Sequence, residues 1–417
     1  MLTRALMACT RTRKRGLALQ QFDVVVAGAG PAGVVMAVHL AQAGVRVLLL
    51  EATPAPAQDL RASTFHPPTL EYLASLGLSQ ALHAAGLRAP EYRWINRQNG
   101  HQVRFDFSEL ADVTPFPYRL QAEQWKLTGH AIEVLGGLPS ATVRFSCRAV
   151  GYHDAGAHID VYIETPHAIE TVSARYLVAC DGANSILRKW AGIEFEGFTY
   201  EEKFLCLSTV EPVEQRLGDV GLINYMADPA QWMVLLRAPT AWRVLVAADA
   251  ATPDAELLSD ARKDEVFAQL LGAPARIATT HRTIYRVHQR VARQYRLGRV
   301  ILVGDAAHLN NPLGGFGMNS ALHDVRNLCG KLIPIVLEGA EDEPLLDAYE
   351  RQRRTVMHEF IQAQSIQNKR LIEMSGGDRQ VTQEAELSAT AADPVRRRAY
   401  LLRQSMLSAV AREREIA

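Results

Sequence analysis

Residues 22–51 have the sequence FDVVVAGAGPAGVVMAVHLAQAGVRVLLLE, and this stretch decides the fold. Its first part, Phe22–Ala27, is apolar and β-branched and has the length of a buried strand. Glycines interrupt it, and the pattern then predicts a helix over 31–43 and a second strand over 45–50. The stretch is therefore a strand–helix–strand unit with a glycine-rich first turn.

The glycines and one acid give this unit a dinucleotide-binding pattern. Gly28, Gly30 and Gly33 occupy the positions of a GxGxxG motif, and Glu51 follows the second strand. Gly28 allows the tight turn, Gly30 lets a pyrophosphate approach the helix N-terminus, and Gly33 permits close packing of helix and strand. Glu51 can accept both hydroxyls of an adenosine ribose, which favours FAD or NAD. The structural alternative is a glycine-rich turn without a ligand.

Composition narrows the class of protein. A chain of 417 residues can form two domains or lobes, and its 45 basic residues balance its 45 acidic residues, so no nucleic-acid partner is expected. The five scattered cysteines form no CxxC pair, which disfavours a disulfide framework and any metal site and favours a reducing cytoplasm. No apolar run is long enough for stable membrane insertion.

The first twenty residues contain five basic residues and no acid. A transit peptide has such a composition, but this stretch lacks a clean apolar core and a cleavage site. We therefore interpret residues 1–20 as a disordered basic arm or the product of an upstream start codon.

The rest of the chain alternates strands, helices and turns. A hairpin is expected over 92–107, because Asn99-Gly100 is the strongest short turn signal. The other expected elements are helices over 68–76, from Gln121 to 136 and over 260–271, strands over 142–152, 158–164 and 171–179, a strand-rich second lobe over 195–248, a strand over 299–303, a helix from Met318, charged helices from 343 and an exposed helical tail after Gly376.

Two further motifs each follow a predicted strand. Residues 181–188 have the sequence DGANSILR, and residues 304–308 have the sequence GDAAH. After three more residues, the sequence PLGGFGMN at 312–319 predicts a loop and the start of a helix. Together with the GxGxxG unit, these motifs resemble the class A flavoprotein aromatic hydroxylases, the para-hydroxybenzoate hydroxylase family. The resemblance covers roughly residues 21–360, and LDAYER at 346–351 also fits it.

The resemblance implies an α/β fold with an α+β second lobe, in which a Rossmann-like GxGxxG FAD-binding domain is interleaved with a β-sheet substrate domain and followed by C-terminal helices. The implied boundaries are 21–90, 116–192 and 286–340 for the FAD-binding domain, 91–115 and 193–285 for the substrate-binding domain, and 341–417 for the helical region.

The resemblance also implies which residues bind the cofactor. Asp181-Gly182 serves both FAD and the nicotinamide nucleotide, and Arg61 approaches the cofactor phosphates. Asp305 lies near a phosphate or ribitol hydroxyl of FAD, and the glycines at 314–317 lie along the flavin edge. The expected FAD-binding residues are Gly28, Gly30, Ala32, Gly33, Glu51, Arg61, Gln121, Asp181, Gly182, Asp305, Gly315, Gly317, Met318 and Asn319. The structural alternative is a buried Asp181–Arg188 ion pair, with Ser185 as a helix cap.

The activity that the resemblance implies is aromatic hydroxylation. NADH or NADPH docks transiently, since there is no second GxGxxG, and reduces FAD, whose C4a-hydroperoxide then passes one oxygen atom from dioxygen to a phenolic or pyridinol ring. Pro312 and His308 are the candidates beside the reacting atoms, although a histidine at a strand end is more often structural. The candidate substrate residues are Tyr225, Arg237 and His66. Each could instead be an ordinary core or surface residue without contact to the substrate. A homodimer is common in the family.

Two other functional classes stay open. A flavin-dependent reductase of the same fold would need no oxygen, and a non-catalytic binding protein would keep the fold without FAD. A halogenase is disfavoured, because the stretch at Trp94 does not match the Trp-x-Trp-x-Ile-Pro motif.

Overall fold

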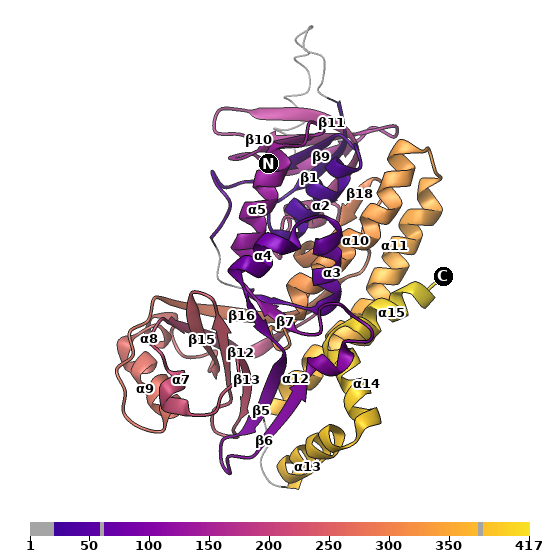
Figure 1. Cartoon of the computed structure of the whole chain (residues 1–417). Helices are drawn as coiled ribbons and strands as arrows, with labels where there is room; N and C mark the ends of the chain where they lie inside the picture. The colour runs from indigo at the N-terminus through magenta and orange to yellow at the C-terminus, as the bar shows by residue number, and fades with distance from the viewer. Residues whose placement is uncertain (1–20, 59–61, 374–377) are drawn as a thin grey trace.

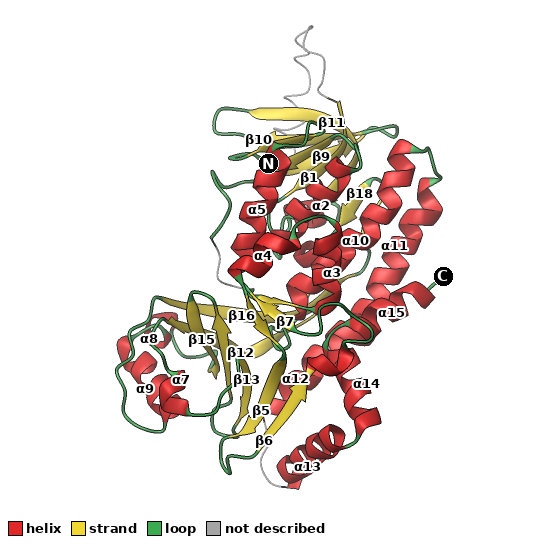
Figure 2. Ribbon diagram, viewed as in Figure 1, coloured by secondary structure: helices red, strands yellow, loops and turns green. Residues whose placement is uncertain are grey.

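The computed structural model describes residues 21–58, 62–373 and 378–417 (Figure 1). The expected N-terminal arm, 1–20, and Arg61 lie outside the described residues. Two eight-stranded sheets and one three-stranded sheet organise the described chain, with helices between and around them (Figure 2).

The first sheet contains the strand–helix–strand unit. Its strand order is β17-β18-β11-β1-β2-β8, with β10 and β9 continuing from β11. The strands are β1 (Gln21–Ala27), β2 (Val47–Leu50), β8 (Ala141–Arg144), β9 (Arg148–Asp154), β10 (Ile159–Glu164), β11 (Ile169–Ala179), β17 (Arg296–Leu297) and β18 (Val300–Leu302). Because β2, β1, β11 and β18 run parallel, their carboxyl ends, and the turns that follow them, meet at one edge of the sheet.

The second sheet has the order β19-β16-β12-β15-β14-β13-β5-β6. Its strands are β5 (Glu91–Asn96), β6 (Gln102–Asp106), β12 (Phe195–Thr209), β13 (Ile223–Ala227), β14 (Met233–Ala238), β15 (Ala241–Ala248), β16 (His281–Ala292) and β19 (His308–Leu309). The small sheet, β3 (Thr64–Phe65), β7 (Arg119–Gln121) and β4 (Leu87–Ala89), lies between the two large ones (Figure 2).

The helices cover these sheets and connect them. Helix α2 (Pro31–Gln42) packs between α5 (Gln124–Gly136) and α10 (Phe316–Leu337) on the first sheet. The others are α3 (Pro67–Ser75), α4 (Ser79–Ala85), α6 (Ile186–Trp190), α7 (Glu214–Leu217), α8 (Asp254–Leu257), α9 (Asp260–Leu271), α11 (Asp342–Val356), α12 (Ala363–Glu373), α13 (Asp378–Ala392), α14 (Pro394–Gln404) and α15 (Leu407–Glu415), with short η1 (Phe107–Leu110), η2 (Gly304–Ala306) and the π-helical η3 (Met357–Gln362).

Three expected elements are wrong in detail. Gln121 does not open a helix, because it ends β7 and α5 begins only at Gln124. The strand expected over 142–152 is two strands, β8 and β9, which occupy different places in the first sheet on either side of Ser146, a residue with φ 52°. The tail after Gly376 is not merely exposed, because α14 and α15 bury side chains such as Leu401 against the body.

In the described ranges, no helix combines the length and the apolar content that a crossing of the bilayer needs. The four cysteines within these ranges are all free.

Candidate functional site

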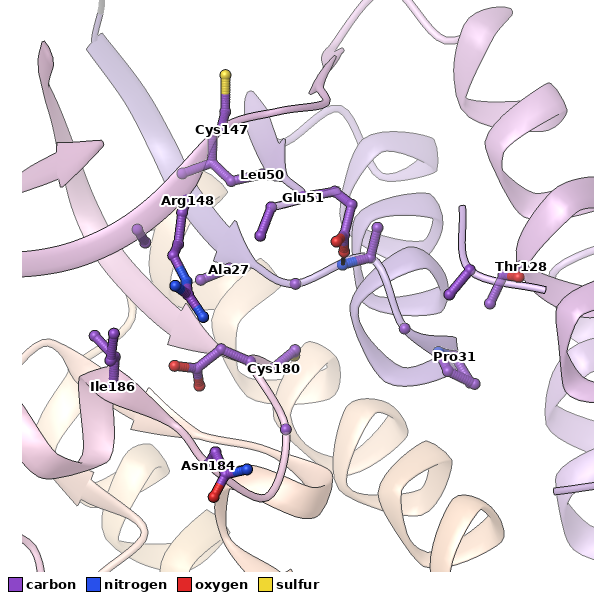
Figure 3. A pocket seen from close by; sticks show the side chains of 18 of the residues that line it. Ala27, Pro31, Leu50, Glu51, Thr128, Cys147, Arg148, Cys180, Asn184 and Ile186 are labelled. Carbon is purple, nitrogen blue, oxygen red and sulfur yellow. Dashed lines mark hydrogen bonds between the residues drawn. The ribbon is translucent and has the colours of Figure 1, made fainter. Parts of the chain in front are cut away.

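A cavity of about 290 Å³ opens at the carboxyl edge of the first sheet. The turn after β1, the end of β2, the start of β9, the turn after β11 and the first residues of α5 form its walls. Figure 3 shows Glu51 facing the glycine turn, and Arg148 pointing from β9 towards the turn after β11. Parallel strands place their ligand-binding turns at such an edge, so the cavity has the position of a nucleotide site.

The three glycines of the first turn differ in what surrounds them. Gly28 has φ +99°, and a Cβ there would lie 2.4 Å from the carbonyl oxygen of Cys180. A Cβ on Gly33 would lie 1.8 Å from the carbonyl oxygen of Gly28. A Cβ on Gly30 would have no atom within 4 Å. Only glycine fits at positions 28 and 33, because backbone atoms pack against both. The space at Gly30, the N-cap of α2, is instead open to a ligand.

The acids around the cavity fit the ADP part of FAD. The Glu51 Oε2 atom accepts a hydrogen bond from the Ala29 amide at 2.8 Å, and Oε1 accepts from the Thr53 amide at 2.9 Å. Oε1 also accepts from the Thr53 hydroxyl at 2.8 Å. These three bonds fix the carboxylate beside the glycine turn and leave a lone pair on Oε2 for a ribose hydroxyl. Asp181 Oδ2 accepts from the Leu187 amide at 3.2 Å, while its buried Oδ1 has no partner among the described residues. A buried acceptor without a donor is what a cofactor hydroxyl would satisfy.

The motif after Gly182 has a structural part. Ser185 caps α6 by accepting the Arg188 amide at 2.9 Å, as the structural alternative supposed. Arg188 is buried, but its guanidinium donates to the carbonyls of Ala306 and Ala183 rather than to Asp181. It therefore ties this turn to the turn after β18. Asp305 lies in that second turn on an exposed part of η2.

A second cluster forms where the loop before α10 meets the small sheet. The Thr64 hydroxyl lies 3.1 Å from the Gln121 amide, and Asn319 Nδ2 donates to the carbonyls of Thr64 and Gly315 at 2.8 and 2.7 Å. A Cβ on Gly315, which has φ +71°, would touch Thr64 at 3.0 Å. The structure thus brings Gln121, Gly315 and Asn319 together, and it places Gly317 and Met318 in the adjoining first turn of α10.

The predicted residues around Pro312 have different surroundings. Pro312 is exposed at the tip of the loop. His66 is fully buried: its Nε2 lies 2.8 Å from the Gly314 carbonyl oxygen, and its ring stacks on Phe316. Burial, together with nearby Arg119, holds the pKa of His66 well below its usual value, so the ring is neutral. His66 thus supports the loop rather than a cavity wall.

His308 belongs to a buried charge network. Its Nε2 lies 2.7 Å from Asp324 Oδ2, and Asp324 also accepts from the Gly304 amide at 3.0 Å and from Arg353 Nε at 2.7 Å. Arg353 continues the network to Glu413 on α15. These contacts are those of a structural histidine that orders the turn after β18.

The candidate substrate residues Tyr225 and Arg237 lie on opposite faces of the second sheet. Tyr225 belongs to the apolar layer that faces α12 and α14, whereas the Arg237 guanidinium lies over the Trp242 ring in the layer that faces α9. One ring bound at either face cannot contact both side chains, so at most one of Tyr225 and Arg237 can bind a given substrate ring. Among the strand residues of this sheet, Arg243 lies on the Tyr225 side and donates to Ser63 and Tyr285.

A small cavity lies beside Tyr225. It is lined by Tyr92, Trp94, Tyr225, Asn368, Leu371, Ile372, Tyr400 and Gln404. The residues that sequence reasoning missed are Thr64, Arg148 and the members of this lining other than Tyr225. Arg148 reaches the first cavity from β9, Thr64 meets α10, and the lining comes from the second sheet, α12 and α14, so no local pattern indicates these contacts.

Known proteins resemble this chain over nearly its whole length. The family described as FAD binding domain matches residues 21–364. Para-nitrophenol 4-monooxygenase of a Pseudomonas species is 32% identical over 384 residues, covering 91% of this chain and 94% of that protein. The 6-hydroxy-3-succinoylpyridine 3-monooxygenase of Pseudomonas putida is 32% identical over 352 residues, covering 83% and 88%. The crystal structure of p-nitrophenol 4-monooxygenase from Pseudomonas putida is 29% identical with a TM-score of 0.87, covering 92% and 98%.

Proposed function

The chain belongs to the FAD-binding-domain family of class A flavin-dependent aromatic monooxygenases, and on that premise we propose a small phenol or pyridinol as its substrate and dioxygen as its oxidant. It is an FAD-dependent oxidoreductase that consumes NAD(P)H and hydroxylates a small aromatic or N-heteroaromatic ring. The proposal for the substrate is carried by the near full-length similarity to two enzymes whose names specify a nitrophenol and a hydroxypyridine.

We assign the cofactor to two clusters. The cavity at Gly30, Glu51 and Asp181 holds the ADP part of FAD, and the cluster of Thr64, Gln121 and Asn319 lies where the flavin part follows. When bound, FAD supplies the chemistry: it accepts a hydride from NAD(P)H and activates dioxygen for transfer of one oxygen atom to the ring.

The chain's own contribution is to bind, orient and shield. Gly315 is the N-cap of α10, so the amides of the first turn have no acceptor inside the helix and would stabilise negative charge on a cofactor ring bound there. Behind the loop, His66 and Asn368 bond to the carbonyls of Gly314 and Leu313, at 2.8 and 3.3 Å. A loop held in this way keeps Pro312 in a fixed position, where it would lie beside the reacting side of the flavin ring and limit the entry of water.

We also propose that the protein works in the cytoplasm and forms a homodimer. Four described cysteines without a disulfide fit a reducing compartment such as the cytoplasm. The homodimer implied by the resemblance is checked by light scattering of the FAD-loaded protein.

The test is NAD(P)H oxidation by the FAD-loaded protein in air, with phenols and pyridinols added one at a time and products analysed by mass. Under ¹⁸O₂, we expect one ring to stimulate turnover and to gain a single labelled oxygen atom. A yellow protein that no ring stimulates, and that turns over equally well without oxygen, would favour the reductase. A purified protein that takes up no flavin would favour the binding protein.

A further inference from the structure

Arg119 is a buried cation without an acidic partner in the described chain. Its side chain is among the largest that are fully buried, with 1% of the residue exposed. One guanidinium nitrogen donates to the Gln404 carbonyl at 3.0 Å, and Nε has no hydrogen-bond partner among the described residues. The rest of the group lies over aromatic rings, 5.0 Å from the centroid of Tyr92 and 4.9 Å from that of Phe107.

A buried charge of this kind is costly unless an opposite charge accompanies it. Arg353 is buried to the same degree, and it shows the usual solution, because it pairs with Asp324 at 2.7 Å and with Glu413. Contacts with ring faces offset only part of the cost of desolvation at Arg119. The contrast between the two arginines suggests that the counter-charge of Arg119 arrives with a ligand.

The neighbouring titratable groups do not supply that charge. Burial and the Tyr400 hydroxyl raise the pKa of Tyr92 well above its usual value, and burial raises that of Tyr400 as well. Both phenols therefore stay neutral at physiological pH. His66, the nearby imidazole, also stays neutral because its pKa is lowered. The positive charge of Arg119 is thus uncompensated by these neighbours.

The small cavity beside Tyr225 is separated from the Arg119 guanidinium by the residues of its own wall. Tyr92, whose ring contacts Arg119, and Gln404, whose carbonyl accepts from it, both line the cavity. Its volume of about 20 Å³ is enough for one water-sized group, so it suits an oxygen atom rather than a whole ring. Asn368 lines the same cavity and donates to the Leu313 carbonyl, which joins the cavity to the loop of Pro312.

We propose that Arg119 selects an aromatic substrate that carries an oxyanion, a phenolate or a carboxylate, by placing a positive charge behind the cavity of Tyr92, Tyr225 and Gln404. This proposal rests on the proposed function, since it concerns the substrate of the same site. Arg119 acts through the cavity wall and is therefore a positioning residue. The Gln404 amide donates to Asn368 and Tyr400. One N–H of Asn368 donates to the Leu313 carbonyl, so the second N–H of Asn368 is the one available to donate to the oxyanion.

The experiment measures the dissociation constants of ring pairs from the change that they cause in the flavin absorbance of the FAD-loaded protein. One pair is 4-hydroxybenzoate and neutral 4-hydroxybenzamide, and the other is 4-nitrophenol, ionised at about pH 8.5, and neutral 4-nitroaniline. For at least one pair we expect the anion to bind about tenfold or more tightly. The pair that shows the preference identifies the source of the charge, carboxylate or phenolate.

Three variants separate charge from structure. Arg119→Met should remove most of the preference for the anion, and Arg119→Lys should restore part of it, because lysine keeps the charge without the planar fork. Arg88→Met is the matched control and should leave the preference unchanged. Arg88 lies on β4, the strand beside that of Arg119, and its guanidinium also lies over an aromatic ring, that of Tyr118, but its side chain is exposed. FAD content and circular dichroism show whether each variant is folded.

Equal affinity for both members of both pairs in the wild-type protein would overturn the proposal, whatever happens to the variants. So would an anion preference that survives in a folded Arg119→Met protein. The proposed function fails in a different way, when no ring yields a product with one added oxygen atom. The anion preference is measured without turnover, so the two failures are distinguishable.

Discussion

Gly30 and Gly33 stand three residues apart, yet a methyl group would affect different properties: FAD affinity at Gly30 and the stability of the fold at Gly33. Gly30 has φ −67° and open space at its Cβ position, so Gly30→Ala should change the unfolding free energy of the FAD-free protein by less than about 0.5 kcal/mol. The methyl group would occupy the path of the pyrophosphate, and the affinity for FAD should fall about tenfold or more. Flavin fluorescence titration and urea unfolding measure the two quantities.

Gly33→Ala serves as the comparison within the same turn. Its Cβ would lie 1.8 Å from a backbone oxygen, so the folded protein should lose about 3 kcal/mol or more whether FAD is present or not. If Gly30→Ala destabilised the FAD-free protein as much as Gly33→Ala, the space at Gly30 would not belong to a ligand.

Residue-level prediction from the sequence succeeded where backbone geometry dictates the residue type. The positive φ of Gly28 and the contact of Gly33 with the Gly28 carbonyl belong to one strand–helix unit, so the spacing indicates both glycines, although Gly28 also packs on Cys180 in the turn after β11. The sequence could not separate Tyr225 from Arg237, because successive residues of a strand face opposite sides of the sheet and no local signal says which side faces α12 and α14 and which faces α9. Arg119 was missed for a different reason: its neighbours come from α14 and the second sheet, and no local pattern indicates these contacts.

At the scale of elements, helix α15 is fastened to the turn after β18 by charges. Glu413 on α15 pairs with Arg353, and Arg353 pairs with Asp324, which accepts the Gly304 amide at 3.0 Å. Removing the Glu413 charge leaves a buried guanidinium with one partner fewer, so Glu413→Gln should lower the unfolding free energy by about 3 kcal/mol. The affinity for FAD should fall as well, because Gly304 opens the turn that holds Asp305.

The control for this change lies two residues along the same helix. The Glu415 side chain is 67% exposed, and its 3.6 Å pair with Arg412 is a surface pair, so Glu415→Gln should change the unfolding free energy by less than about 1 kcal/mol. Equal effects of the two substitutions would mean that helix α15 is held by its apolar contacts rather than by the charge network.

The sequence predicted the elements whose signals are local. The first strand–helix–strand unit, the hairpin that turns at Asn99-Gly100 and helix α9 over 260–271 appear where the pattern places them. The break at Ser146 was missed because it joins two places in the sheet, which is a property of topology rather than of local propensity. The burial of α14 and α15 was missed because their partners lie far away in the chain.

At the scale of the whole molecule, two fully buried histidines link stability to pH. Burial is the main reason that the pKa values of His66 and His323 lie well below 6.5, with Arg119 acting further on His66 and Arg326 and Arg353 acting further on His323. The unfolded chain takes up protons at these two residues as the pH falls through about 6.5, whereas the folded protein does not. The unfolding free energy therefore falls as the pH falls below that value.

The linkage predicts a slope of up to about 1.4 kcal/mol per pH unit for each histidine between about pH 6 and pH 5. The pKa values of the buried acids Asp324 and Glu413 are lowered from 3.8 and 4.5, so their contribution is lost at lower pH and adds little in this window. Urea unfolding of the FAD-loaded protein at several pH values should show the slope, and His323→Gln should reduce it. Burial also lowers the pKa values of His39, His288 and His358, so these histidines keep their share of the slope in the variant. His167→Gln, at an exposed position, should leave the slope unchanged. A stability that stays constant from pH 7 to pH 5 would mean that the folded protein protonates both rings, and that His66 does not support the Pro312 loop as a neutral donor.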